Sequence, residues 1–126
     1  MSTTLPNAVA APTDLPHALS VDVEDWFQVL NMAQHIDRAD WDRFELRCGD
    51  STRRLLDLFA RRSARATFFF LGWIAERLPD LVREVHAAGH EIGSHGYDHR
   101  VLPDLGREGF ADDLQRTADV LHAIVG

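Results

Sequence analysis

Short apolar runs and longer amphipathic segments alternate along this chain of 126 residues. Residues 18–23 and 90–94 have the length of short strands, and residues 66–71 form a continuous apolar run that is rich in aromatic side chains. A continuous apolar run of this length is typical of a parallel strand that is covered on both faces of its sheet. We therefore predict three strands, with the middle one buried on both sides.

Helical patterns separate and follow these strands. A helix is predicted at 51–62, with Asp50 or Ser51 as its N-cap. Pro79 divides the next helical stretch and suits the first turn of a new helix that ends near Gly89. A last amphipathic helix is predicted at about 107–125. The side chains predicted to be buried on the first and last helices are Leu55, Leu56, Leu58, Phe59, Phe110, Leu114, Ala118 and Leu121.

The order of strand, helix, strand, helix, strand and helix predicts an α/β fold with a parallel sheet and helical crossovers. In such folds ligands bind at the carboxyl ends of the strands, because loops from neighbouring strands converge there. Two polar clusters occupy these positions. Asp22, Glu24 and Asp25 lie at the end of the first strand, and His95 and His99 lie just beyond the third.

Two histidines four residues apart can bind one metal ion, and hydrolytic sites typically add a third protein ligand and a position for water. Because alternate residues of a strand point to the same side, Asp22 and Glu24 project together, so that one could bind metal while the other takes a proton. Clustered charges also occur in solvated loops. Their joint position at strand ends favours a metal site, since a cation relieves the repulsion between neighbouring carboxylates.

Composition narrows the function classes. The formal charge is −7, from 20 acidic and 13 basic residues, which argues against nucleic-acid binding and against attraction to an anionic membrane. Cys48 is the single cysteine and cannot form an internal disulfide, so we expect a cytoplasmic protein. Residues 1–17 lack the features of a secretory signal and are predicted to be a flexible tail. No apolar run approaches the length of a membrane span.

The segments 20–27, 66–72 and 89–99, in this order, resemble polysaccharide deacetylases of the NodB-homology group, carbohydrate esterase family 4. The similarity is closest to the branch found in exopolysaccharide and exosortase-associated loci, and it covers residues 18–126. It implies the N-terminal part of a distorted (β/α) barrel. It also implies a metal-dependent hydrolase that removes N-acetyl groups from an N-acetylhexosamine-containing polysaccharide, with a divalent ion, Zn²⁺ first, as its cofactor.

The family's first motif is Thr-Phe-Asp-Asp, in which the first Asp acts as base and the second binds metal. By this resemblance Asp22 is the catalytic base. Val23 stands where the second Asp is expected, and Glu24 and Asp25 follow it. Strand alternation assigns the metal role to Glu24, and Asp25 remains its competitor.

The family's second motif is His-Ser/Thr-x-x-His, and both of its histidines bind metal. The resemblance assigns these roles to His95 and His99. Gly96 replaces the hydroxyl residue of the motif. We expect the loss of that side-chain hydrogen bond to loosen the loop.

By this resemblance, later motifs of the family would follow Gly126, namely Arg-x-Pro, an Asp/Trp motif and a Leu-x-His motif whose histidine is the general acid, and none of them follows it. A (β/α) barrel also needs about 250 residues. We therefore expect an incomplete barrel, an N-terminal fragment with the base and the metal ligands, and little or no turnover by residues 1–126 alone. An open sheet edge predicts self-association.

Two other hypotheses remain from the sequence. The first is a related hydrolase of small amides or cyclic imides on the same barrel, because the motifs above govern metal chemistry and not substrate shape. The second is a non-catalytic remnant that binds metal or sugar, or docks with another chain that completes the barrel.

Overall fold

A computed structural model describes residues 17–126, so the predicted tail, except for His17, lies outside the described residues. The strands β1 (Ser20–Val23), β2 (Thr67–Phe70) and β3 (Glu91–Ser94) form one parallel sheet in the order β1-β2-β3. The predicted α/β fold with a parallel sheet is confirmed. Neighbours in the sheet are also neighbours along the chain, which is the arrangement in the wall of a (β/α) barrel.

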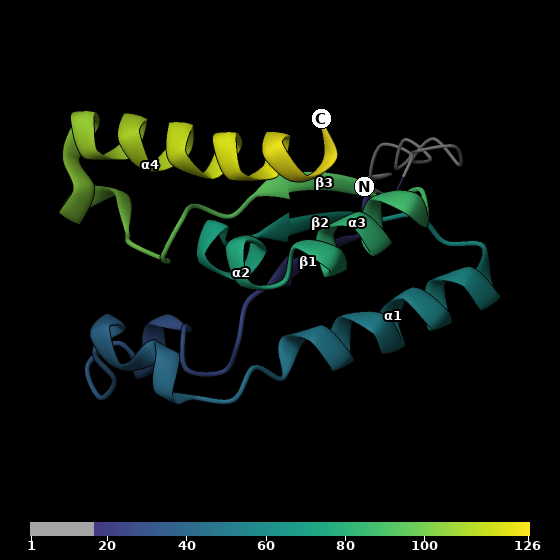
Figure 1. Cartoon of the computed structure of the whole chain (residues 1–126), viewed down its shortest axis with the longest axis horizontal. Helices are drawn as coiled ribbons and strands as arrows, with labels where there is room; N and C mark the ends of the chain where they lie inside the picture. The colour runs from purple at the N-terminus through teal and green to yellow at the C-terminus, as the bar shows by residue number, and fades with distance from the viewer. Residues whose placement is uncertain (1–16) are drawn as a thin grey trace, which may run out of the picture.

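Helices cover one face of this sheet. Helix α3 contacts both α1 and α4, and in Figure 1 it lies in front of the strands between these two helices. Two short 3₁₀ helices occupy the long connection between β1 and the first α-helix. The helical elements are η1 (Leu30–Met32), η2 (Arg38–Arg43), α1 (Cys48–Arg62), α2 (Gly72–Arg77), α3 (Pro79–Ala87) and α4 (Leu102–Val125).

The hydrophobic core lies between the sheet and this helical layer. Phe68 and Phe70 point into it and are fully buried, whereas Phe69 is only partly buried. The prediction that β2 is covered on both faces is therefore wrong for the described residues. Phe69 instead lies over Gly93 of the neighbouring strand, where an added Cβ would come within 2.5 Å of the Phe69 ring.

Helix α1 begins earlier than predicted, at Cys48, and neither Asp50 nor Ser51 is its N-cap. The N-cap position is Arg47, whose side chain makes no capping hydrogen bond. A carboxylate from another segment, that of Asp25, accepts hydrogen bonds from the first backbone N–H groups instead. Local sequence signals for a cap do not reveal a partner of this kind.

Two helical faces are also less buried than predicted. Phe110 and Leu114 of α4 are 41% and 47% exposed, while Thr117 and Leu121 of the same helix are buried. Leu58 of α1 is likewise exposed. Periodicity indicates an apolar face, but the extent of its burial depends on neighbouring elements, and those present among residues 17–126 cover only part of each face.

In the described sheet, β1 and β3 are the edge strands. Self-association through such an edge stays a prediction. Within residues 17–126, no helix has the length and apolar character needed to cross a membrane.

Candidate metal centre

The carboxyl ends of β1 and β3 bring three potential metal ligands together. Glu24 directly follows β1, and His95 directly follows β3, where its backbone N–H continues the ladder by donating to the carbonyl of Phe70 at 2.9 Å. His99 lies in the loop that leads to α4. One ligand atom from each of Glu24, His95 and His99 lies within 4.8 Å of the other two.

The three side chains face a common point. Oε2 of Glu24 is 2.9 Å from Nε2 of His99 and 3.7 Å from Nε2 of His95. Among the described residues, buried Oε2 of Glu24 and buried Nε2 of His95 have no hydrogen-bond partner. Buried polar atoms are normally paired, so unpaired atoms directed at one point fit a shared cation. Two imidazoles and one glutamate are also a donor set used in hydrolytic zinc sites.

These groups influence each other's protonation. The neighbouring imidazole of His95 lowers the pKa of the Glu24 carboxyl, and this effect outweighs burial, which raises it. In return, Glu24 raises the pKa of His95 against the opposing effect of burial, and Asp22 adds to the increase. A carboxylate held in its charged form beside imidazoles suits the binding of a cation.

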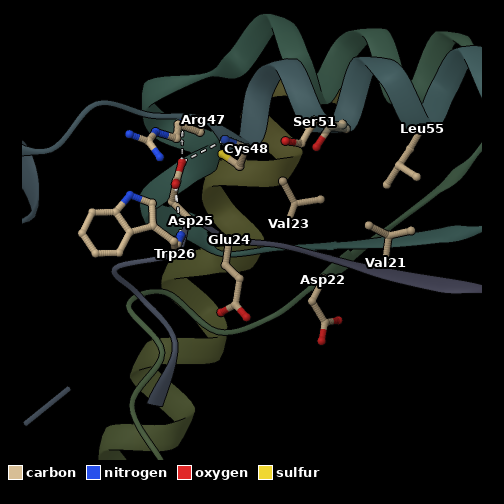
Figure 2. A pocket seen from close by; sticks show the side chains of 11 residues that line it. Val21, Asp22, Val23, Glu24, Asp25, Trp26, Arg47, Cys48, Ser51 and Leu55 are labelled. Carbon is tan, nitrogen blue, oxygen red and sulfur yellow. Dashed lines mark hydrogen bonds between the residues drawn. The ribbon is translucent and has the colours of Figure 1, made fainter. Parts of the chain in front are cut away.

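Asp22 lies beside this group but outside it. Its Oδ2 is 4.0 Å from Nε2 of His95, and its side chain is 53% exposed, compared with 19% for Glu24. Figure 2 shows Asp22 and Glu24 pointing to the same side of β1, while Val21 and Val23 point to the other side. The predicted alternation thus places a solvent-accessible carboxylate next to the three potential ligands.

The carboxylate of Asp25 does not lie with those of Asp22 and Glu24. It is only 3% exposed, and its carboxylate accepts hydrogen bonds from the backbone N–H groups of Trp26 at 3.0 Å, Arg47 at 2.6 Å and Cys48 at 2.9 Å. The dashed lines in Figure 2 show how this side chain reaches the start of α1. The geometry separates Asp25 from the group formed by Glu24 and the two histidines.

A pocket of about 280 Å³ lies between β1 and the start of α1. In Figure 2, Val21, Val23 and Leu55 face this space, whereas the carboxylate ends of Asp22 and Glu24 point away from it. Cys48 also lines the pocket, and burial, followed by the charge of Asp25, raises the pKa of its thiol to about 12. The thiol is therefore protonated at neutral pH and is a poor nucleophile.

The model of the polysaccharide deacetylase family matches residues 40–126. The chain belongs to the polysaccharide deacetylase family. A peptidoglycan-N-acetylglucosamine deacetylase of Bacillus cereus is 32% identical over 75 residues, which make up 60% of this chain and 27% of that protein. A chitin deacetylase of Arthroderma benhamiae is 35% identical over 80 residues, covering 60% of this chain and 21% of that protein.

Solved structures of the family show the same fold. The crystal structure of a Mycobacterium smegmatis protein described as a polysaccharide deacetylase matches with a TM-score of 0.71 at 28% identity, and the match covers 94% of this chain and 44% of that one. The matches to the two curated relatives cover only 27% and 21% of their lengths. The chain thus contains one part of a deacetylase domain, with the candidate ligands in it.

Hydrogen bonds to Ser94 and Asp113 stabilise the loop between His95 and His99, at the place where the family's second motif has a hydroxyl side chain. Gly96 lacks the hydroxyl side chain of the motif, but its N–H donates to Oγ of Ser94 at 3.2 Å, and the N–H of Tyr97 donates to both carboxylate oxygens of Asp113 at 3.1 Å. Gly96 has φ of 76°, and an added Cβ would lie 3.1 Å from Oδ2 of Asp113. The expected loosening is therefore offset by other hydrogen bonds.

Sequence reasoning missed two residues that contact this loop. Asp113 approaches it from α4, and Arg38 approaches it from η2, where the guanidinium donates to the carbonyls of Asp98 and His99. Arg38 lies about sixty positions before the loop. No spacing pattern in the sequence connects segments so far apart.

Proposed function

We propose that the whole protein is a metal-dependent hydrolase that removes N-acetyl groups from an N-acetylhexosamine-containing polysaccharide. The observation that carries the proposal is the convergence of Glu24, His95 and His99 beside Asp22, in a chain of the polysaccharide deacetylase family. The names of the two curated relatives, which specify peptidoglycan N-acetylglucosamine and chitin, support an N-acetylated glycan as the substrate.

In this proposal Glu24, His95 and His99 hold a divalent ion, with Zn²⁺ the first choice for a site of two imidazoles and one carboxylate. Glu24 is preferred to Asp25 because the carboxylate of Asp25 is occupied by backbone N–H groups at the start of α1. When bound, such an ion polarises the amide carbonyl and lowers the pKa of a water molecule towards neutrality.

Asp22 is the proposed general base. Its carboxylate is exposed to solvent and adjacent to the ligands, so it can accept a proton from the attacking water. The water oxygen then bonds to the acetyl carbon, the carbon–nitrogen bond breaks, and acetate and a free amine are formed. The amine nitrogen takes a proton from a general acid, a role that the family resemblance gives to the histidine of a Leu-x-His motif.

The test is acetate release from N-acetylglucosamine oligomers and from peptidoglycan fragments by the whole protein. Asp22→Asn is the matched variant, because it preserves side-chain size while removing the base. We expect zinc-dependent acetate release that falls by about 10²–10⁴-fold in this variant. Acetate release that does not depend on Asp22 or on zinc would contradict the mechanism.

The same measurement separates the alternatives. Hydrolysis of small amides or cyclic imides without acetate release from the oligomers would favour the related hydrolase. Zinc binding without turnover of either substrate would favour a non-catalytic role. The metal ligands alone do not distinguish these outcomes, because they act on the carbonyl group that all these substrates share.

A further inference from the structure

One arginine holds the loop that carries both histidines, residues 95–99. Nε of Arg38 donates a hydrogen bond to the carbonyl of Asp98 at 2.8 Å, and Nη2 of Arg38 donates to the carbonyl of His99 at 3.1 Å. The same guanidinium lies 3.7 Å from the Asp98 carboxylate. The guanidinium of Arg38 therefore faces two consecutive carbonyls and one carboxylate of this loop.

These contacts matter because His99 has an unfavourable backbone conformation. His99 has φ of 59°, and within residues 17–126 Ser63 is the only other residue besides glycine with a positive φ. A residue with a Cβ adopts this conformation at a cost and retains it only where its surroundings hold it. In this conformation Nε2 of His99 lies 2.9 Å from Oε2 of Glu24.

Arg38 is itself held in place. It begins the short helix η2, and its guanidinium lies over the ring of Trp41, 5.7 Å from the ring centre. Trp41 is 97% buried in the core, where its ring contacts Phe27 and Trp73. The donors that reach the loop are therefore supported by the packed interior.

We propose that Arg38 is a positioning residue of the metal centre. Its guanidinium keeps His99 in the left-handed conformation that directs the imidazole towards Glu24 and His95. Arginine suits this task because its planar group offers several N–H donors in a fixed geometry, whereas lysine offers a single ammonium group. The inference rests on the proposed function only in that Glu24, His95 and His99 bind metal.

The test is a calorimetric zinc titration of the chelator-stripped chain and of its Arg38→Ala and Arg38→Lys variants. Arg43→Ala is the matched control, because Arg43 belongs to the same helix, is 78% exposed and pairs with Asp40 at 2.9 Å, away from the loop. We expect Arg38→Ala to weaken zinc binding by about 10–100-fold, as is usual when a group that orients a metal ligand is removed. Lysine should restore part of this loss, and Arg43→Ala should bind like the wild type.

Two further readouts separate positioning from general stability. The visible absorption of bound Co²⁺ reports the coordination geometry and should change in Arg38→Ala, while chelator-treated Arg38→Ala should unfold in urea as cooperatively as Arg43→Ala. Wild-type zinc affinity and an unchanged Co²⁺ spectrum in Arg38→Ala would overturn the proposal. If Arg38→Ala does not fold, Arg38→Lys decides, and wild-type affinity with an unchanged spectrum in that variant overturns it.

The wild-type titration separates this inference from the proposed function. Zinc binding by the wild type that is lost in His95→Ala supports the metal site, whatever Arg38 does. A wild type that shows no such binding contradicts the proposed metal centre itself. A wild type that binds, beside an Arg38→Ala variant that binds equally well, rejects only the role of Arg38.

Discussion

The carboxylate of Asp25 accepts a hydrogen bond from the backbone N–H of Cys48 at 2.9 Å and thereby caps helix α1 from a distant part of the chain. Its neighbour Glu24 points instead towards His95 and His99. Two consecutive acids of one motif therefore have different structural positions. This separation makes their contributions to stability and to metal binding experimentally distinct.

Asp25→Ala is expected to destabilise the chain by about 1–3 kcal/mol, because buried backbone N–H groups at the start of α1 lose their acceptor. Asp25→Asn should cost less, since its amide oxygen still accepts hydrogen bonds. Urea unfolding of the metal-free chain measures both effects. An unchanged unfolding free energy for Asp25→Ala would show that the cap contributes nothing to stability.

For metal binding, the variant Glu24→Gln is compared with Asp25→Ala. We expect it to abolish tight zinc binding, because the charged ligand is lost, while Asp25→Ala retains zinc binding to the extent that it remains folded. Calorimetric titration at a temperature where both variants are folded measures this difference. The reverse pattern, in which Asp25→Ala loses zinc and Glu24→Gln retains it, would make Asp25 the ligand.

The pair formed by Glu24 and His95 predicts a pH dependence for the metal-free chain. The pKa of Glu24 is lowered from 4.5, so its contribution to stability is present above that value and is lost as the pH falls through the folded pKa. The pKa of His95 is raised from 6.5, so its contribution is present below that value and is lost as the pH rises through the folded pKa. The stabilisation by the pair should be greatest between pH 4.5 and 6.5.

This dependence is measured as the difference in unfolding free energy between the wild type and Glu24→Gln across the pH range. We expect the difference to peak between pH 4.5 and 6.5. A difference that does not fall at lower or at higher pH would mean that the two side chains do not interact in the folded chain.

The strands and their order could be predicted from the sequence because apolar runs and turns are local signals. Strand alternation also predicts that the Glu24 side chain lies on the same side of β1 as Asp22, as Figure 2 shows. The role of Asp25 could not be predicted in this way, because its partners at Arg47 and Cys48 are remote in the sequence. Neither alternation nor helical spacing reports contacts between segments so far apart.

Contacts between remote segments also decide which helical faces are buried and which residues surround the loop 95–99. Helical spacing correctly groups Phe110 and Leu114 on one face, but their exposure depends on which elements lie next to α4. Arg38 and Asp113 contact the loop from η2 and α4, and their importance becomes visible only when the fold brings the three segments together. Long-range hydrogen bonds to backbone groups leave no periodic pattern in a sequence.

Self-association is a further prediction, because β1 and β3 are edge strands of the described sheet. Light scattering of the chain should give a mass above that of a monomer. Ser20→Lys places a charge on the exposed surface of β1 and should reduce the mass, whereas Leu114→Lys, on the exposed face of α4, should leave it unchanged if the sheet edge is the interface. A monomeric wild type would contradict the prediction.

Gly96→Ser, which restores the hydroxyl residue of the family motif, is expected to weaken zinc binding in this chain. Gly96 has φ of 76°, which disfavours a residue with a Cβ, and the new Cβ would lie 3.1 Å from Oδ2 of Asp113. Displacement of Asp113 would disturb its hydrogen bonds to Tyr97, which lies between His95 and His99 in the loop, so we expect a loss of about tenfold or more in zinc affinity. Gly106→Ala is the control, because Gly106 also has a positive φ of 65°, but an added Cβ meets no atom within 4 Å. The control should lose stability through backbone strain and keep its zinc affinity, whereas tighter zinc binding by Gly96→Ser would show that the added hydroxyl outweighs the crowding.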